Sequence, residues 1–231
     1  HHICKIDFNE VIREHENNEA DITVLYKDFD GKTVNRPLYH QLSVDPNGIV
    51  RDINLYTSPA KGDHICLETY VIKKQLLIDL IKNCIEYEEY DFLKDVVKAN
   101  LKELNVQGYH FTGHMPFIHS LETYHASSME FLNPEILRNY FYDSWEVFTK
   151  IKHEAPAEYA MSSNVSNSLI ANGCIIEGTV ENSIIFRGVK VRKGAIVKNS
   201  IIMQKGDIEE GAQVENIITD KQVIITKDQV I

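Results

Sequence analysis

The sequence lacks any long hydrophobic run, although 43% of its 231 residues are hydrophobic and 25% are charged. No apolar stretch approaches the roughly 18 residues that a membrane-spanning helix needs. The first residues, "HHICKIDFNE", also lack the basic segment and apolar core of a signal peptide. We therefore expect a cytoplasmic globular protein that is not associated with a membrane.

Cysteine is scarce, and the four that occur are Cys4, Cys66, Cys84 and Cys174. They are scattered along the chain without a C-x-x-C pair, so neither a disulfide framework nor a zinc motif is indicated. We expect reduced thiols that fill small buried spaces, as in proteins of a reducing compartment.

A surplus of basic residues is also missing, because the formal net charge is −10. Nucleic acids and anionic membranes select proteins rich in Lys and Arg, so both are disfavoured as partners. Residues 164–231 carry eight basic and eight acidic side chains, which places the whole acidic excess in residues 1–163. The chain therefore has two parts of different composition.

The first part alternates strand and helix patterns. Strands rich in β-branched and aromatic residues are predicted over 21–26, 48–56, 64–72 and 106–111. Helices with one apolar face are predicted over 73–88 and 90–105, the second with Asp91 as N-cap. This alternation predicts an α/β layer with a partly mixed sheet.

The second part is a repeat that begins with "VSNSLI" at 165–170. The phase returns in "VENSII", "VKNSII" and "VENIIT" at spacings of 15, 17 and 17 residues, with Gly or Asn between the aliphatic positions. About 18 residues make one coil of a parallel β-helix, so the repeat predicts about four coils. We expect domains at 1–132 and 164–231, joined by an ordered connector at 133–163 that carries Trp145.

An α/β part followed by such a repeat is typical of two enzyme classes. Hexapeptide acyltransferases place a catalytic His on the β-helix, but no histidine follows His153 here. Sugar-nucleotide pyrophosphorylases place their chemistry in the α/β domain instead. The acyltransferase is therefore the weaker alternative.

Several blocks of sequence, in order, resemble the glucose-1-phosphate adenylyltransferases (ADP-glucose pyrophosphorylases). They are "HICKIDFNEVIREHENNEADITVLY", "YDFLKDVVKANL", "HSLETYHASSMEFL", "DSWEVFTK" with "APAEY", and "NSLIANGCIIEG". The resemblance implies the C-terminal half of a GT-A, Rossmann-like nucleotidyltransferase domain followed by a left-handed parallel β-helix of hexapeptide repeats. It also implies an upstream half with a Gly-rich phosphate loop, which is not in this sequence.

The alignment places unusual residues where the family binds substrate and metal. Tyr56 stands at or beside the sugar-phosphate lysine, with Lys61 the nearest lysine, and Glu68 stands for a glycine of the sugar-binding strand. Pro116 and Phe117 replace an arginine and a metal-binding aspartate. These losses predict a non-catalytic member, most similar to the regulatory subunit that accompanies a catalytic adenylyltransferase in Gram-positive bacteria.

The resemblance thus implies a regulatory subunit in glycogen synthesis, and a heterotetramer with the catalytic subunit is the expected assembly, although a homo-oligomer stays open. We expect no cofactor on this chain and Mg²⁺ on the catalytic partner. A phosphorylated effector is expected, if at all, on the basic residues Arg187, Lys190, Arg192 and Lys193. An active sugar-1-phosphate nucleotidyltransferase with another substrate remains the alternative.

Four histidines, His110, His114, His119 and His125, lie close together in the sequence. A metal site needs three or four ligands that converge, and on a strand followed by a turn these side chains diverge. We therefore expect no metal site at this cluster.

Overall fold

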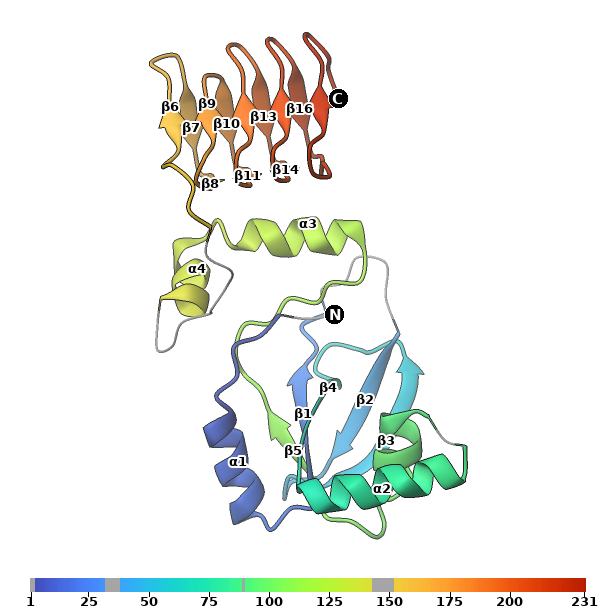
Figure 1. Ribbon diagram of the computed structural model, residues 1–231. Coiled ribbons are helices and arrows are strands. Elements are labelled where there is room, and N and C mark those ends of the chain that lie inside the picture. Colours follow the sequence, from blue (N-terminus) through green and yellow to red (C-terminus); the bar gives the residue numbers. More distant parts are fainter. Residues whose placement is uncertain (1–2, 32–37, 89, 143–151) are drawn as a thin grey trace. The chain divides into compact units, whose positions relative to one another are not determined.

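The computed structural model describes residues 3–31, 38–88, 90–142 and 152–231, which form two compact units (Figure 1). One unit is Cys4–Met115, and the other contains the N-terminus up to Ile3 together with Pro116–Ile231. The domain limits expected at 132 and 163 stay predictions. Residues 143–151 of the expected connector, with Trp145, lie outside the described residues.

The first unit is built on a mixed five-stranded sheet of order β3-β2-β4-β1-β5. Strand β1 (Ile22–Asp28) is antiparallel to β4 (His64–Ile72) and parallel to β5 (Val106–His110). Strands β2 (Tyr39–Val44) and β3 (Val50–Thr57) form a hairpin, and β2 pairs with β4 only at Gln41–Leu42. All four predicted strands of this part are confirmed within two residues, whereas β2 had no predicted range.

Three helices accompany this sheet in the described part of the unit. They are α1 (Phe8–Asn17), α2 (Lys74–Glu86) and the π-helix η1 (Phe92–Lys98). Apolar residues of α2 and η1 pack against a core that includes Ile22, Val24, Leu42, Ile53 and Val106. No helix among the described residues is long and apolar enough to cross a membrane.

The prediction of an α-helix over 90–105 is wrong in type and length, although its N-cap is confirmed. The Asp91 carboxylate accepts a hydrogen bond from the Lys94 amide at 2.9 Å, and the helix that follows ends at Lys98. The side-chain amide of Asn100 donates to the Val96 carbonyl at 2.7 Å. This carbonyl is the one that the Asn100 backbone amide would use in an α-helix, so the side chain competes with helical pairing.

The second unit begins with two helices, α3 (Leu121–Glu130) and α4 (Pro134–Phe141). Ser120 and Thr123 form a capping box at the start of α3, which explains why the helix begins there. The Nε2 atom of His125 lies 2.6 Å from the Asn199 carbonyl oxygen, a contact between α3 and the repeat region.

The repeat region is a left-handed parallel β-helix of about four turns, as predicted (Figure 1). Three sheets form its faces, with the orders β16-β13-β10-β7, β14-β11-β8 and β17-β15-β12-β9-β6. The strands on the first face are β7 (Asn164–Ser166), β10 (Thr179–Glu181), β13 (Ile196–Lys198) and β16 (Gln213–Glu215). Those on the second are β8 (Leu169–Ile170), β11 (Ile184–Ile185) and β14 (Ile201–Ile202). Those on the third are β6 (Glu158–Tyr159), β9 (Ile175–Ile176), β12 (Lys190–Val191), β15 (Asp207–Ile208) and β17 (Ile224–Ile225).

Repeated Asn and Ser residues connect successive coils. Asn167, Asn182, Asn199 and Asn216 adopt left-handed backbones with φ of 41°, 47°, 46° and 57°. The Asn167 amide donates to Asn182 at 2.8 Å, and the Asn182 amide donates to Asn199 at 2.6 Å. Ser hydroxyls also accept hydrogen bonds from backbone amides of the next coil. The Ser183 hydroxyl, for example, accepts one from the Ser200 amide at 3.1 Å. Asn therefore supplies both the turn and a bond between coils, since its short polar side chain tolerates this backbone.

We predict that Asn182→Ala destabilises the β-helix more than Asn182→Gly does. Both changes remove the two amide bonds of the ladder, but only Ala places a Cβ in the left-handed conformation, at a cost of about 1 kcal/mol. Equilibrium urea unfolding of the two variants provides the comparison. Equal stability of the two would show that the backbone conformation contributes nothing.

His15 makes the first unit sensitive to acid. It is buried on α1, and its Nδ1 lies 2.8 Å from the Thr23 hydroxyl. Burial, and then the charge of Lys73, lower the pKa of His15 below its ordinary value. Between this lowered pKa and the ordinary one the unfolded chain binds more protons, so stability falls as the pH falls through that window.

We predict that His15→Asn flattens this pH dependence between pH 7 and pH 5, because Asn does not titrate there. Unfolding midpoints measured across this range test the prediction. His125→Asn serves as the control. His125 lies in the other unit, so its replacement leaves the pH dependence that His15 gives the first unit unchanged. An unchanged slope in His15→Asn would contradict the prediction.

Candidate functional site

Tyr56 and Glu68, which the resemblance aligns with substrate-binding positions, lie on β3 and β4. Both have left-handed backbones, with φ of 55° at Tyr56 and 49° at Glu68. Leu67, Glu68 and Thr69 stand opposite Leu25 of β1, because the register shifts between the Val24–Tyr70 and Tyr26–Cys66 pairs. A glycine adopts such a φ without cost, which agrees with the alignment of Glu68 to a family glycine.

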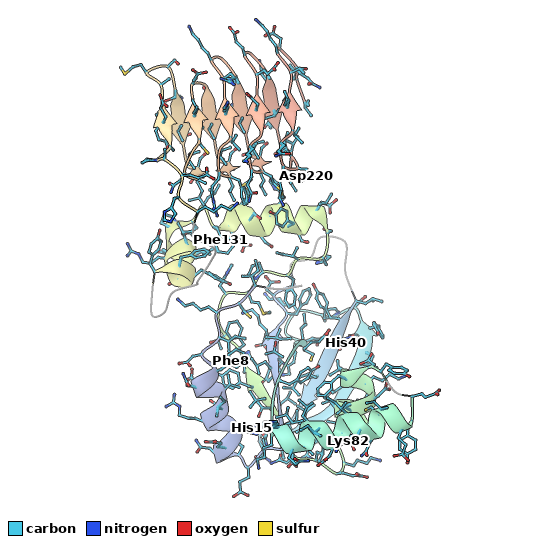
Figure 2. The ribbon with its side chains drawn as sticks, viewed as in Figure 1. Phe8, His15, His40, Lys82, Phe131 and Asp220 are labelled. Carbon is cyan, nitrogen blue, oxygen red and sulfur yellow. The ribbon has the colours of Figure 1, made fainter. Side chains whose placement is uncertain are left out.

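His40 of β2 brings these two residues together. Its Nδ1 accepts a hydrogen bond from the Tyr56 amide at 3.4 Å, and its ring meets the Tyr56 ring edge-on at 4.7 Å. Its Nε2 lies 3.8 Å from the Glu68 carboxylate, whose side chain is 63% exposed. Figure 2 labels His40 within this unit. No motif in the sequence points to His40, whose strand β2 is not among the predicted strands.

A buried thiol lies beside the backbone of Glu68. The Glu68 amide lies 3.4 Å from the Cys66 sulfur. Burial raises the pKa of the Cys66 thiol to about 12, so this thiol stays protonated and unreactive near neutral pH. The side chain of Lys61, the lysine nearest to Tyr56 in the sequence, lies beside Gly31.

Pro116 and Phe117 fall in the second compact unit. Pro116 is buried, and its carbonyl accepts a hydrogen bond from the Ile3 amide at 3.3 Å. Neither side chain offers an oxygen that could bind Mg²⁺, the metal that the family reaction requires. Among the described residues, no group of three or more His, Cys, Asp or Glu is arranged to hold a metal ion. The residues at these positions thus do not fit the family's metal.

Two of the four histidines of 110–125 have separate contacts. His110 pairs with Asp28 at 3.3 Å, and His125 contacts the Asn199 carbonyl. Asp28 also pairs with His64 at 2.7 Å, and the Tyr26 ring lies between the two imidazoles, at 4.6 Å from His64 and 5.0 Å from His110. Sequence reasoning missed this arrangement, although Asp28 and His110 end two parallel strands, where α/β sheets bind ligands.

The four residues proposed for an effector do not form one basic patch. Arg192 makes two hydrogen bonds to Asp207, at 2.9 and 2.8 Å. With Lys193 and Lys227 it lines a hollow of about 480 Å³ that also contains the acidic residues Glu177, Asp207, Glu209 and Glu210. Arg187 and Lys190 do not line this hollow. A phosphorylated effector at these residues stays a prediction, and the acidic side chains of the hollow oppose it.

Comparisons with known proteins agree with this architecture. Residues 151–231 match the family described as GlmU-like, C-terminal hexapeptide. The chain is 36% identical over 227 residues to the glycogen biosynthesis protein GlgD of Bacillus subtilis (strain 168), covering 98% of this chain and 56% of that protein. GlgD of Geobacillus stearothermophilus is 34% identical over 195 residues, covering 84% of this chain and 46% of the relative.

A glucose-1-phosphate adenylyltransferase of Thermosipho africanus (strain TCF52B) is 30% identical over 201 residues, covering 85% of this chain and 48% of that protein. The chain thus spans about half the length of the curated relatives it matches. Similarity across both units and the shared order of the sequence blocks place it with these relatives. Over this half, the chain belongs to the family of the glucose-1-phosphate adenylyltransferases and the GlgD glycogen biosynthesis proteins.

Proposed function

We propose that this chain is the C-terminal half of a regulatory subunit that does not make ADP-glucose itself. It acts in glycogen synthesis by modulating a catalytic glucose-1-phosphate adenylyltransferase. The observation that carries the proposal is that Tyr56, Glu68, Pro116 and Phe117 stand where the resemblance places a lysine, a glycine, an arginine and an aspartate, while the fold around them is kept.

The electrostatics at Glu68 support the loss of the reaction. Transfer to a sugar phosphate needs cations on the phosphates and carboxylates that hold Mg²⁺. A carboxylate about 4 Å from a phosphate charge costs about 4 kcal/mol at an effective dielectric constant near 20, unless a cation intervenes. The His40 Nε2 atom, at 3.8 Å from the Glu68 carboxylate, is too far for a hydrogen bond.

Association with a catalytic subunit, in a heterotetramer with Mg²⁺ on the catalytic partner, completes the proposal. A coupling free energy of about 1–3 kcal/mol across the subunit contact is typical of allosteric proteins, equivalent to about 5- to 150-fold in affinity. A regulatory subunit of this kind needs no catalytic residue of its own, since it acts only through the free energy of the contact.

The test uses the full-length protein that contains this chain and the catalytic adenylyltransferase of the same organism. We expect the full-length protein alone to release no pyrophosphate from ATP and glucose 1-phosphate. We expect a mixture to show at least a fivefold change in kcat or in half-saturating substrate, relative to the catalytic subunit alone. Glu68→Gln in the regulatory protein is the control, because removing one charge does not restore the lost Mg²⁺ ligands.

Normal synthesis of ADP-glucose by the full-length protein alone would overturn the proposal. Product formation from another nucleoside triphosphate or sugar 1-phosphate in a substrate screen would instead establish an active transferase with a different substrate. An unchanged catalytic subunit in the mixture would also contradict the regulatory role.

A further inference from the structure

Two β-bulges lie in β3 and β4, the strands on either side of β2. In β3, Leu55 and Tyr56 stand opposite His40 alone, because the register between β2 and β3 shifts there. In β4, Glu68 is the middle one of three residues that stand opposite Leu25 of β1. Bulges re-aim side chains and are frequent next to functional sites, as are left-handed backbones at residues other than glycine. Tyr56 and Glu68 combine both features, which points to a use for their side chains.

His40, which lies between them, presents a hydrogen-bond donor toward Glu68 (Figure 2). Its Nδ1 accepts a hydrogen bond from the Tyr56 amide, so the proton of the neutral imidazole lies on Nε2. This Nε2 lies 3.8 Å from the Glu68 carboxylate, which accepts hydrogen bonds when it is ionised. A donor and an acceptor therefore stand side by side at a distance too long for a bond between them.

A ligand hydroxyl satisfies this pair of groups. It accepts a hydrogen bond from the His40 Nε2–H and donates its own hydrogen to the Glu68 carboxylate. An ammonium group cannot accept from the imidazole. A carboxylate or a fully ionised phosphate cannot donate to Glu68 and is repelled by its charge. The pair therefore selects alcohols over cations and anions.

The Tyr56 ring supplies an apolar surface beside this pair. Tyr56 is 60% exposed, and its ring plane stands at 70° to that of His40. An edge-on contact of this kind covers at most one face of the Tyr56 ring. Neighbouring strands lie about 4.8 Å apart, so the backbones of β3 and β4 are about 10 Å apart across β2. A ligand that contacts both Tyr56 and Glu68 is therefore extended, with an apolar face and free hydroxyls.

From these contacts we infer that Tyr56, His40 and Glu68 form a binding site for an uncharged saccharide. The CH groups of a sugar ring pack on the Tyr56 ring, and a hydroxyl group lies between His40 and Glu68. A sugar phosphate fits less well, because its charge opposes that of Glu68. Binding at this site needs no catalytic subunit, so it goes beyond the proposed regulatory role and does not rest on it.

The test measures binding of saccharides to the full-length protein that contains this chain, without a catalytic subunit. The probes are maltose and cellobiose, each compared with its own 1-phosphate by isothermal titration calorimetry. We expect at least one disaccharide to bind at least tenfold more tightly than its 1-phosphate, because only the phosphate opposes the Glu68 carboxylate.

Substitutions then locate the saccharide. Tyr56→Ala removes the apolar surface and weakens binding about tenfold, whereas Tyr56→Phe keeps the ring and binds normally. Both keep a Cβ, so neither changes the strain of the left-handed backbone. Glu68→Gln removes the charge and narrows the difference between the disaccharide and its 1-phosphate. Tyr159→Ala is the matched control, since Tyr159 is 52% exposed on β6 in the other unit. Thermal melts confirm that each variant is folded.

Three results would overturn the inference. The first is that neither disaccharide binds, and the second is that a 1-phosphate binds more tightly than its disaccharide. The third is unchanged binding in both Tyr56→Ala and Glu68→Gln, which would place the saccharide elsewhere. The regulatory role is decided separately, by the kinetics of the catalytic subunit, so a saccharide site stands even where no regulation is found.

Discussion

At Glu68 the backbone of β4 turns left-handed, and three of its residues stand opposite one residue of β1. A non-glycine residue in this conformation costs about 1–3 kcal/mol and persists only where its surroundings hold it. Here the surroundings are β1 on one side and, through His40, the β2–β3 hairpin on the other. Among the described residues, the hairpin pairs with β4 through two residues, Gln41 and Leu42. The His40 contacts with Tyr56 and Glu68 therefore add to the contact between the hairpin and β4. The residues of the candidate site therefore also help to connect the β2–β3 hairpin to the rest of the sheet.

The two units differ in how far their sequences predict them. In the β-helix, each turn repeats the same local pattern and stacks on the previous one, so period and phase predict the fold, and the Asn positions predict the turns. In the first unit, strand ranges followed from β-branched and aromatic residues. The π-helix did not follow from its apolar pattern, and the Asn100 side chain, which takes the Val96 carbonyl, opposes its continuation as an α-helix beyond Lys98. Helix α1 was missed although Asp7 caps it by accepting a bond from Asn9, a local signal that was available.

The site was harder to predict than the fold, for a physical reason. Tyr56 and Glu68 were found only by their alignment with the family, and nothing near them in the sequence names His40 as their common neighbour. The same holds for Asp28 between His64 and His110, which strand order alone brings together. For the basic residues of the β-helix, the charges can be read from the sequence but their partners cannot, and Arg192 is hydrogen-bonded to Asp207. Pairing across strands depends on tertiary register, and a single sequence shows no register.

Replacement of the residues aligned with the family's site is compatible with retention of the fold, because different side chains carry the two. Tyr56 and Glu68 expose most of their side chains, whereas the buried positions beside them, such as Ile53, Ile65 and Leu67, are apolar and less than 2% exposed. Burial of such a side chain contributes about 1.5–3 kcal/mol to the stability of the fold. This contribution does not depend on the chemistry of the exposed neighbours. A substrate-binding residue can therefore be replaced without unfolding the sheet.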